Sequence, residues 1–188
     1  MARNRAVIYV LSVSLDGYIE GPDGGIDWSF PDQELHEHFN QQEKAVDVHL
    51  YGRGLYENMS TYWPYALDNP AAAKEEQEYA RLWLDMRKVV FSRTLKHVDW
   101  NAALAGGDIA EEVARLKKEP GGSLSVGGPG LAASFMELDL IDEYHMYVFP
   151  VVLGGGKRMY PLQAEAMKLR LADTQVFRSG VVRLRYTR

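Results

Sequence analysis

Short apolar runs, rich in β-branched residues, alternate with segments of helical periodicity along this chain of 188 residues. The first run covers residues 5–13 and is almost continuously apolar, which is typical of a strand covered on both faces. Alternation of this kind predicts a three-layer α/β/α fold with a mainly parallel central sheet and an antiparallel C-terminal hairpin. The other expected strands are 46–51, 87–92, 123–126, 143–152, about 167–177 and 181–187, the last two joined by Arg178-Ser179-Gly180.

The segments between these runs have the features of helices. The first helix is expected over about residues 32–44, with its start at Pro31 or Asp32. Gly52-Arg53-Gly54 is expected to form a loop that leads into a short helical turn. Asn69-Pro70 predicts the start of the next helix, because asparagine caps helices and proline suits their first position.

The composition excludes several classes of function. The net charge is −5, from 21 basic and 26 acidic residues, and no dense lysine or arginine run offers a footprint for nucleic acid. The absence of cysteine excludes disulfides and thiolate chemistry. No apolar stretch approaches the roughly 18 residues of a membrane span, and the N-terminal run lacks a cleavage site, so we expect a cytoplasmic protein with no membrane partner. Without a repeat or linker, residues 1–188 are expected to form one domain.

The segment Gly127-Gly128-Pro129-Gly130 follows an expected strand and begins an expected helix, after an earlier helix that Asp108 caps. Glycine lets the backbone approach a ligand, and free N–H groups at a helix N-terminus attract phosphate, although Pro129 has no N–H to donate. The spacing is not that of the Rossmann fingerprint. A phosphate-binding turn and a plain tight turn both remain open on this segment alone.

Six segments, taken in order over almost the whole chain, resemble the dihydrofolate reductase superfamily. Within that superfamily they are most similar to the C-terminal reductase domain of the bifunctional riboflavin-biosynthesis deaminase-reductases, the RibD C-terminal domain. The fold that this resemblance implies is dihydrofolate reductase-like, in agreement with the α/β pattern. The segments are Ser14–Ile19 after the first strand, Asp27-Trp28, Tyr51–Glu57, Val89–Arg93, Val126–Leu131, and Leu140–Tyr144 continuing through Pro150–Gly156.

The resemblance implies a role for each matched cofactor residue. Gly52 and Arg53 match a turn whose arginine lies near the 2′-phosphate of the cofactor, and Ser92 and Arg93 match a strand-end pair on its adenosine side. Two arginines around one phosphate give charge-assisted contacts, so the resemblance favours NADPH over NADH. The other matches are Gly127, Gly128, Gly130 and Leu131 in the diphosphate-binding turn, and Ser12 and Ile19 beside the nicotinamide.

The substrate side departs from the family. Dihydrofolate reductases carry a carboxylate two residues after a proline on the first helix, but here Gln33 stands two residues after Pro31. Asp32 is the remaining candidate for the proton donor, if the helix is rotated or shifted. Asp27-Trp28 match the lining of the substrate pocket, with loop packing as the alternative. Lys157 follows three glycines and could hold a substrate phosphate, with an exposed turn as the alternative.

A metal site is not expected. Asp32, Glu34, His36 and His38 share one expected helix, but side chains two residues apart on a helix diverge, which favours a solvated face. His49, in a strand-like run, is expected to be structural.

These features predict an NADPH-dependent oxidoreductase that transfers hydride to a small pyrimidine- or pterin-like heterocycle, similar to 5-amino-6-(5-phosphoribosylamino)uracil reductase. The alternative is a non-catalytic protein that binds a dinucleotide or small ligand on the same fold, which Gln33 favours. A purely structural subunit is a third possibility and predicts no cofactor binding. A homodimer is expected, since the closing hairpin leaves a strand edge free.

Overall fold

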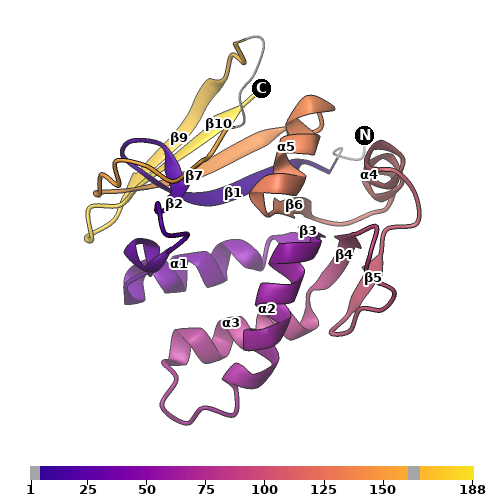
Figure 1. Cartoon of the computed structure of the whole chain (residues 1–188), viewed down its shortest axis with the longest axis horizontal. Coiled ribbons are helices and arrows are strands. Elements are labelled where there is room, and N and C mark those ends of the chain that lie inside the picture. Colours follow the sequence, from indigo (N-terminus) through magenta and orange to yellow (C-terminus); the bar gives the residue numbers. More distant parts are fainter. Residues whose placement is uncertain (1–4, 161–165) are drawn as a thin grey trace.

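One eight-stranded sheet organises the computed structural model, which describes residues 5–160 and 166–188 (Figure 1). The strand order is β5-β4-β3-β6-β1-β7-β10-β9. The first six of these strands are parallel, and β10 runs antiparallel to both β7 and β9. The strands are β1 Val7–Ser14, β3 Val46–Gly52, β4 Arg87–Phe91, β5 Ala102–Leu104, β6 Ser123–Gly127, β7 Glu143–Phe149, β9 Arg170–Val176 and β10 Val182–Thr187, with β2 Tyr18–Glu20 and β8 Lys157–Arg158 pairing separately.

Helices cover both faces of the sheet, which confirms the three-layer prediction (Figure 1). Helices α4 and α5 lie on one face, and α1, α2 and α3 lie on the other. The helices are α1 Gln33–Glu43, α2 Arg53–Ala66, α3 Lys74–Asp85, α4 Ile109–Lys118 and α5 Pro129–Glu137, with a 3-10 turn η1 at Asp27–Ser29.

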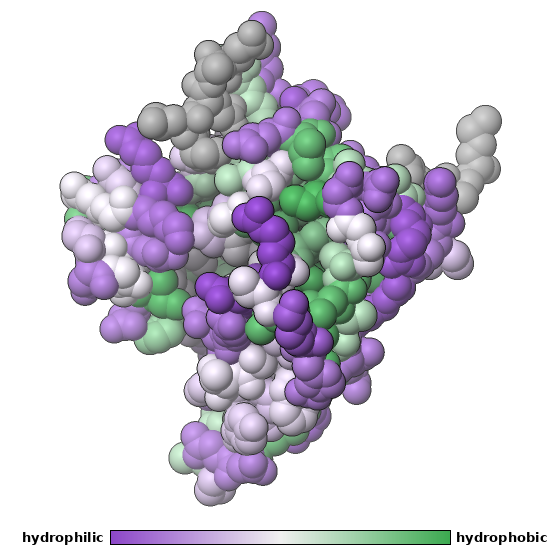
Figure 2. Space-filling view, turned by 45° about the vertical axis from the view of Figure 1, so that its right-hand side comes forward, coloured by the Kyte–Doolittle hydropathy of each residue, from purple (hydrophilic) through white to green (hydrophobic). Residues whose placement is uncertain are grey.

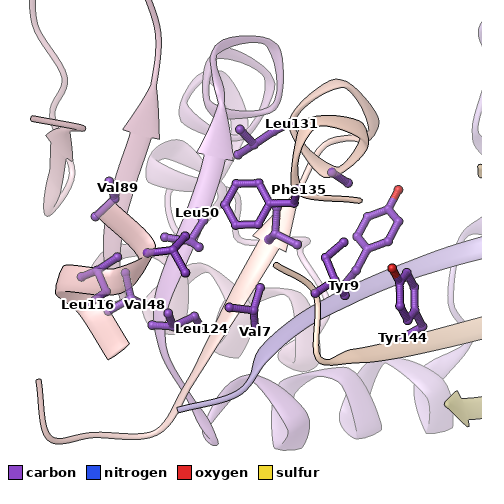
Figure 3. Close-up of a cluster of buried hydrophobic side chains, with 14 of the residues drawn as sticks. Val7, Tyr9, Val48, Leu50, Val89, Leu116, Leu124, Leu131, Phe135 and Tyr144 are labelled. Carbon is purple, nitrogen blue, oxygen red and sulfur yellow. The ribbon is translucent and has the colours of Figure 1, made fainter. Parts of the chain in front are cut away.

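The face under α4 and α5 is closely packed and apolar. Alternate residues of the strands point to this side, since successive side chains of a strand leave on opposite faces. Leu50 of β3 and Leu124 of β6 are fully buried there against Leu116 of α4 and Phe135 of α5 (Figure 3). This face therefore holds the main hydrophobic core and supports the strands from behind.

The opposite face carries polar side chains in the same strands. His49 and Tyr51 of β3, Ser125 of β6 and Tyr147 of β7 are buried on this side. Burying polar groups is costly unless they are hydrogen-bonded or functional, so this face is the place to look for a site.

Two helix boundaries differ from the sequence prediction. Helix α2 begins directly at Arg53 and runs for 14 residues, where a loop and a short turn were expected. Helix α3 begins at Lys74 and not at Asn69-Pro70, because the Asn69 carboxamide accepts a hydrogen bond from Ala71 N and forms a local turn. The cap at Asp108 is confirmed, since its Oδ1 accepts from Glu111 N at 2.8 Å.

No helix in the described part of the chain is both long and apolar enough to cross a bilayer. Figure 2 shows apolar areas on one face of the molecule that are bordered by hydrophilic side chains.

Lys88 of β4 is a fully buried charge on the polar face of the sheet. Its Nζ donates to the carbonyl oxygens of Met86 and Trp100, at 2.8 and 2.7 Å, and lies 4.3 Å from the ring centroid of Trp83. Trp100 has a left-handed backbone with φ of 61°. Lys88 thus ties the segment after β4 back to the start of that strand. Burial lowers the pKa of Lys88 from 10.5 to about 8.

The stability of the protein should therefore depend on the protonation of Lys88. Between pH 8 and 9.5 the unfolded chain holds this proton more tightly than the folded protein, so the free energy of unfolding should rise with pH, by about 1 kcal/mol. Lys88→Met should remove the rise. Denaturant titrations at several pH values check this, and parallel curves for the two proteins would contradict it.

Candidate active site

The turn between β6 and α5 leaves no room for a side chain at Gly127. A Cβ atom on Gly127 would lie 2.6 Å from Leu55 Cδ2 and 3.2 Å from the ring of Tyr51. Gly128 follows with φ of 89°, a backbone conformation that favours glycine, and forms the N-cap of α5. A Cβ on Gly130 would meet nothing within 4 Å. The bend is tight on the α2 side and open around Gly130.

Two arginines lie at the same edge of the sheet as this turn. The strand register pairs Tyr51 with Gly127 and Gly52 with Phe91, so the carboxyl ends of β3, β4 and β6 meet there. Arg53 begins α2 immediately after β3, and Arg93 follows β4 by two residues. Both side chains are exposed, and Arg53 Nε is 3.9 Å from Glu57 Oε2.

Arg93 has no ion-pair partner among residues 5–160 and 166–188. Since the Arg53 pair is long and exposed, it neutralises little of the charge. The edge therefore offers two cations and the N-terminus of a nine-residue helix to an anionic ligand.

A cavity of about 850 Å³ lies beside this edge, between the polar face of the sheet and helices α1, α2 and α3. Ser12 and Gly127, two of the predicted cofactor residues, are part of its lining. A ligand on the glycine turn would thus reach the cavity without crossing a strand. The rest of the lining is Val10, Leu11, Phe30, Pro31, His36, Phe39, Glu43, His49, Tyr51, Leu55, Met59, Tyr62, Trp63, Ala73, Glu76, Tyr79, Ser125, Val126 and Tyr147.

Aromatic rings form much of the cavity wall. Trp63 lies 4.3 Å from Tyr79 and 5.0 Å from Tyr62, measured between ring centroids. On the side of α1, Phe39 meets Tyr147 edge-to-face at 4.7 Å. Walls of this kind suit a flat, unsaturated ring, which gains contact with aromatic faces and edges.

Most protonatable groups of the cavity belong to residues that the sequence did not predict to be part of a site. His49 Nε2 lies 3.0 Å from Glu43 Oε2, and both side chains are largely withdrawn from solvent. Tyr62 donates a hydrogen bond to Glu76, which raises the pKa of Tyr62. Burial lowers the pKa of His36, which favours its neutral form near pH 7. The cavity can therefore exchange a proton with a bound ligand.

Two sequence interpretations of histidines are revised by these positions. The sequence predicts a solvated helix face for His36 and a structural role for His49, but both residues line the cavity. The signal on α1 was present in the sequence, because His36, Phe39 and Glu43 recur at i, i+3 and i+7 and share one face of the helix.

Four residues predicted for the substrate side, one as proton donor and three as substrate contacts, lie outside this lining. Asp32 is the N-cap of α1, and its Oδ1 accepts from Leu35 N at 2.9 Å. Trp28 packs edge-to-face on Phe149 at 5.6 Å, and Asp27 lies beside it around a separate depression. Lys157 of β8 forms an ion pair of 3.1 Å with Glu20. The structure thus does not bring these residues together with the cavity.

The remaining cofactor positions lie at or near the carboxyl edge. A Cβ atom on Gly52 would contact Leu131 Cβ at 3.4 Å, so the ends of β3 and the start of α5 are in contact. The Ser92 hydroxyl is engaged within its own loop, since it accepts hydrogen bonds from Thr94 N and Leu95 N. Ile19 packs against the main core from β2. None of the described histidines and carboxylates form a group of three arranged to hold a metal ion.

Comparison with known proteins places this geometry in a family. The profile of the RibD C-terminal domain matches residues 5–183. The uncharacterized protein YyaP of Bacillus subtilis is 36% identical over 187 residues, which cover 98% of this chain and 95% of YyaP.

Solved structures give the same fold. A putative riboflavin biosynthesis protein from Shewanella sp. PV-4 has a TM-score of 0.77 at 23% identity, with 97% of this chain and 98% of that one covered. A deaminase/5-amino-6-(5-phosphoribosylamino)uracil reductase from Thermotoga maritima has 0.68 at 16%, covering 98% of this chain and 56% of that one. Dihydrofolate reductase from Enterococcus faecalis, complexed with NADP(H), has 0.62 at 11%, covering 100% and 98%. At these identities the likeness concerns the fold.

Asp32 provides a direct test of capping against a role in proton transfer. Asp32→Ala should lower the free energy of unfolding by about 1 kcal/mol, because Leu35 N loses its acceptor. Asp32→Ser, which can still accept that hydrogen bond, should recover most of the loss and should leave any turnover within about twofold of the unaltered protein. A stable Asp32→Ser protein without turnover would show that Asp32 takes part in the reaction.

Proposed function

Because the chain belongs to the RibD C-terminal domain family, we propose that it is an NADPH-dependent reductase that transfers hydride to a small heterocyclic substrate. One observation carries the proposal: Ser12 and Gly127 line a large aromatic cavity at the same sheet edge as a glycine turn and two exposed arginines. A cofactor seated on the turn and a substrate in the cavity would then be neighbours.

The residues of the edge fit a dinucleotide with a 2′-phosphate. The open space around Gly130 and the side-chain-free approach at Gly127 leave room for phosphate oxygens close to backbone. The N–H groups of Gly130 and Leu131 in the first turn of α5 would hold the diphosphate, and Arg53 and Arg93 would hold the 2′-phosphate. When bound, NADPH supplies the hydride.

The chain itself supplies orientation, shelter from water and a proton. The rings of Phe39, Trp63 and Tyr79 would hold a flat substrate against the mouth of the glycine turn. The pair formed by Glu43 and His49 can deliver a proton inside the cavity, directly or through a water molecule. Proton donation thus need not come from the first-helix position that Gln33 occupies.

A second candidate function is a non-catalytic protein that binds a dinucleotide or another small ligand at this edge. Gln33 favours it, since dihydrofolate reductases, which the chain resembles, carry a carboxylate at that position. It predicts cofactor binding without oxidation of NADPH by any pterin or pyrimidine. Measuring NADPH oxidation in the presence of such compounds separates the two functions.

We also propose that two chains pair through the free edge of β9. This strand ends the sheet, and its Leu171 and Val176 are 50% and 73% exposed. An exposed apolar edge strand is prone to pairing with another chain.

A charge placed at the glycine turn tests the cofactor site. Gly130→Asp adds a carboxylate in open space, so the fold should persist while the affinity for NADPH falls by about tenfold or more. Ala114→Asp, on the exposed side of α4, is the matched control and should bind normally. Quenching of protein fluorescence during an NADPH titration measures both, and equal affinities would contradict the site.

The two arginines should discriminate between the cofactors. Arg53→Gln and Arg93→Gln should each weaken NADPH binding by about tenfold and leave NADH binding nearly unchanged, because only NADPH carries the 2′-phosphate. Arg81→Gln, at an exposed position of α3, is the control. Parallel losses for NADPH and NADH would show that the arginines do not contact the 2′-phosphate.

A further inference from the structure

We propose that the cavity selects a planar nitrogen heterocycle that is uncharged or protonated and carries no phosphate group. This inference rests on the proposed reductase function and names the substrate class of the same site. Its basis is the charge of the lining: among the described residues that line the cavity, the formally charged ones are Glu43 and Glu76, and none is a lysine or an arginine.

A phosphorylated substrate would find no lysine or arginine in the described lining to balance its charge. Phosphate recognition in proteins uses arginine, lysine or a free helix N-terminus. The one predicted substrate cation, Lys157, is paired with Glu20 at 3.1 Å and does not line the cavity. Arg53 and Arg93 lie at the carboxyl edge and are not part of the lining, so they are left for the cofactor.

The N-terminus of α3 does not change this balance. It reaches the cavity wall through Ala73, which lacks a side-chain cap. However, Glu75 and Glu76 stand in the first turn of the helix, where their carboxylates offset the positive end of the helix dipole. A phosphate there would meet like charge, and like charge disfavours binding at close range.

The acidic groups are placed to accept hydrogen bonds from a basic ring. Glu43 is held beside His49 in the interior of the cavity, at 3.0 Å. Glu76 lies near Tyr62, from which it accepts a hydrogen bond. Carboxylates accept hydrogen bonds and do not donate them, so they suit ring N–H and amino groups, and they stabilise a protonated ring nitrogen.

The shape of the lining agrees with a compact ring. Trp63 and Tyr79, 4.3 Å apart, form one wall with Met59, and Phe39 and Tyr147 form another. Protonation of a ring nitrogen also lowers the electron density of the adjacent carbon, which eases its reduction by hydride. The charge of the cavity and the proposed reaction therefore favour the same substrate.

Direct binding tests the proposal without relying on turnover. Calorimetry would compare 2,4-diaminopyrimidine, cytidine and cytidine 5′-monophosphate, with and without saturating NADP⁺, which blocks the cofactor's own phosphate sites. We expect diaminopyrimidine and cytidine to bind, and the monophosphate to bind about tenfold more weakly than cytidine in the presence of NADP⁺. Equal or tighter binding of the monophosphate, or no binding of the other two, would overturn the proposal.

Matched variants test whether Glu43 and Glu76 cause this preference for uncharged or protonated rings without phosphate. Glu43→Gln and Glu76→Gln should each weaken diaminopyrimidine binding about fivefold or more and narrow the gap between cytidine and its monophosphate. Glu37→Gln and Glu78→Gln change glutamates of the same helices that do not line the cavity, and should have no effect. Equal behaviour of all four variants would also overturn the proposal. Failure of NADP⁺ to bind, with the ring preference intact, would count against the reductase function alone.

Discussion

The parallel pairing of β6 between β1 and β3 is the constraint on which the site depends. In this register Val126 lies beside both Tyr9 and Leu50, deep in the sheet, and Gly127 lies beside Tyr51. The alternation of side chains then turns Val126 toward the core and Gly127 toward the cavity. Because Gly127 has no side chain, the backbone of β6 can end against Leu55 of α2. A shift of one residue would reverse these directions and turn the Val126 side chain toward the cavity.

The two faces of the sheet divide the tasks of stability and function. Under α4 and α5, residues such as Leu124 and Phe135 exclude water completely and hold the strands in place. The other face has a cavity in place of a filled core, and buried polar groups such as His49 and Ser125 border it. The apolar core fixes the strand ends firmly enough for the opposite face to leave space for a ligand.

Local patterns in the sequence predicted the parts of the fold that local physics determines. The apolar run of β1, the cap at Asp108 and the glycine turn all have short-range causes, namely strand periodicity, a side-chain acceptor and positive φ. The predicted start of α3 was wrong because the Asn69 side chain accepts a hydrogen bond within a local turn and does not cap the helix. Strands of two or three residues, such as β8, are too short to give a periodic signal.

The cavity could be predicted only in part, because packing between distant elements creates it. Glu43 and His49 are six residues apart in sequence and on different elements, and only the docking of α1 on the sheet brings them together. The sequence predicts that His36, Phe39 and Glu43 share one face of a helix. It does not predict which part of the protein that face contacts. Tertiary packing thus brings the acidic and aromatic lining groups together, whereas the local sequence is enough to predict the glycine turn.

A crystal structure of the protein with NADPH would test the central claim most directly. The account predicts the diphosphate against the N-terminus of α5, the 2′-phosphate between Arg53 and Arg93, and the nicotinamide at the mouth of the cavity beside Ser12 and Gly127. A nucleotide bound elsewhere on the protein, or a nicotinamide that points away from the cavity, would contradict it.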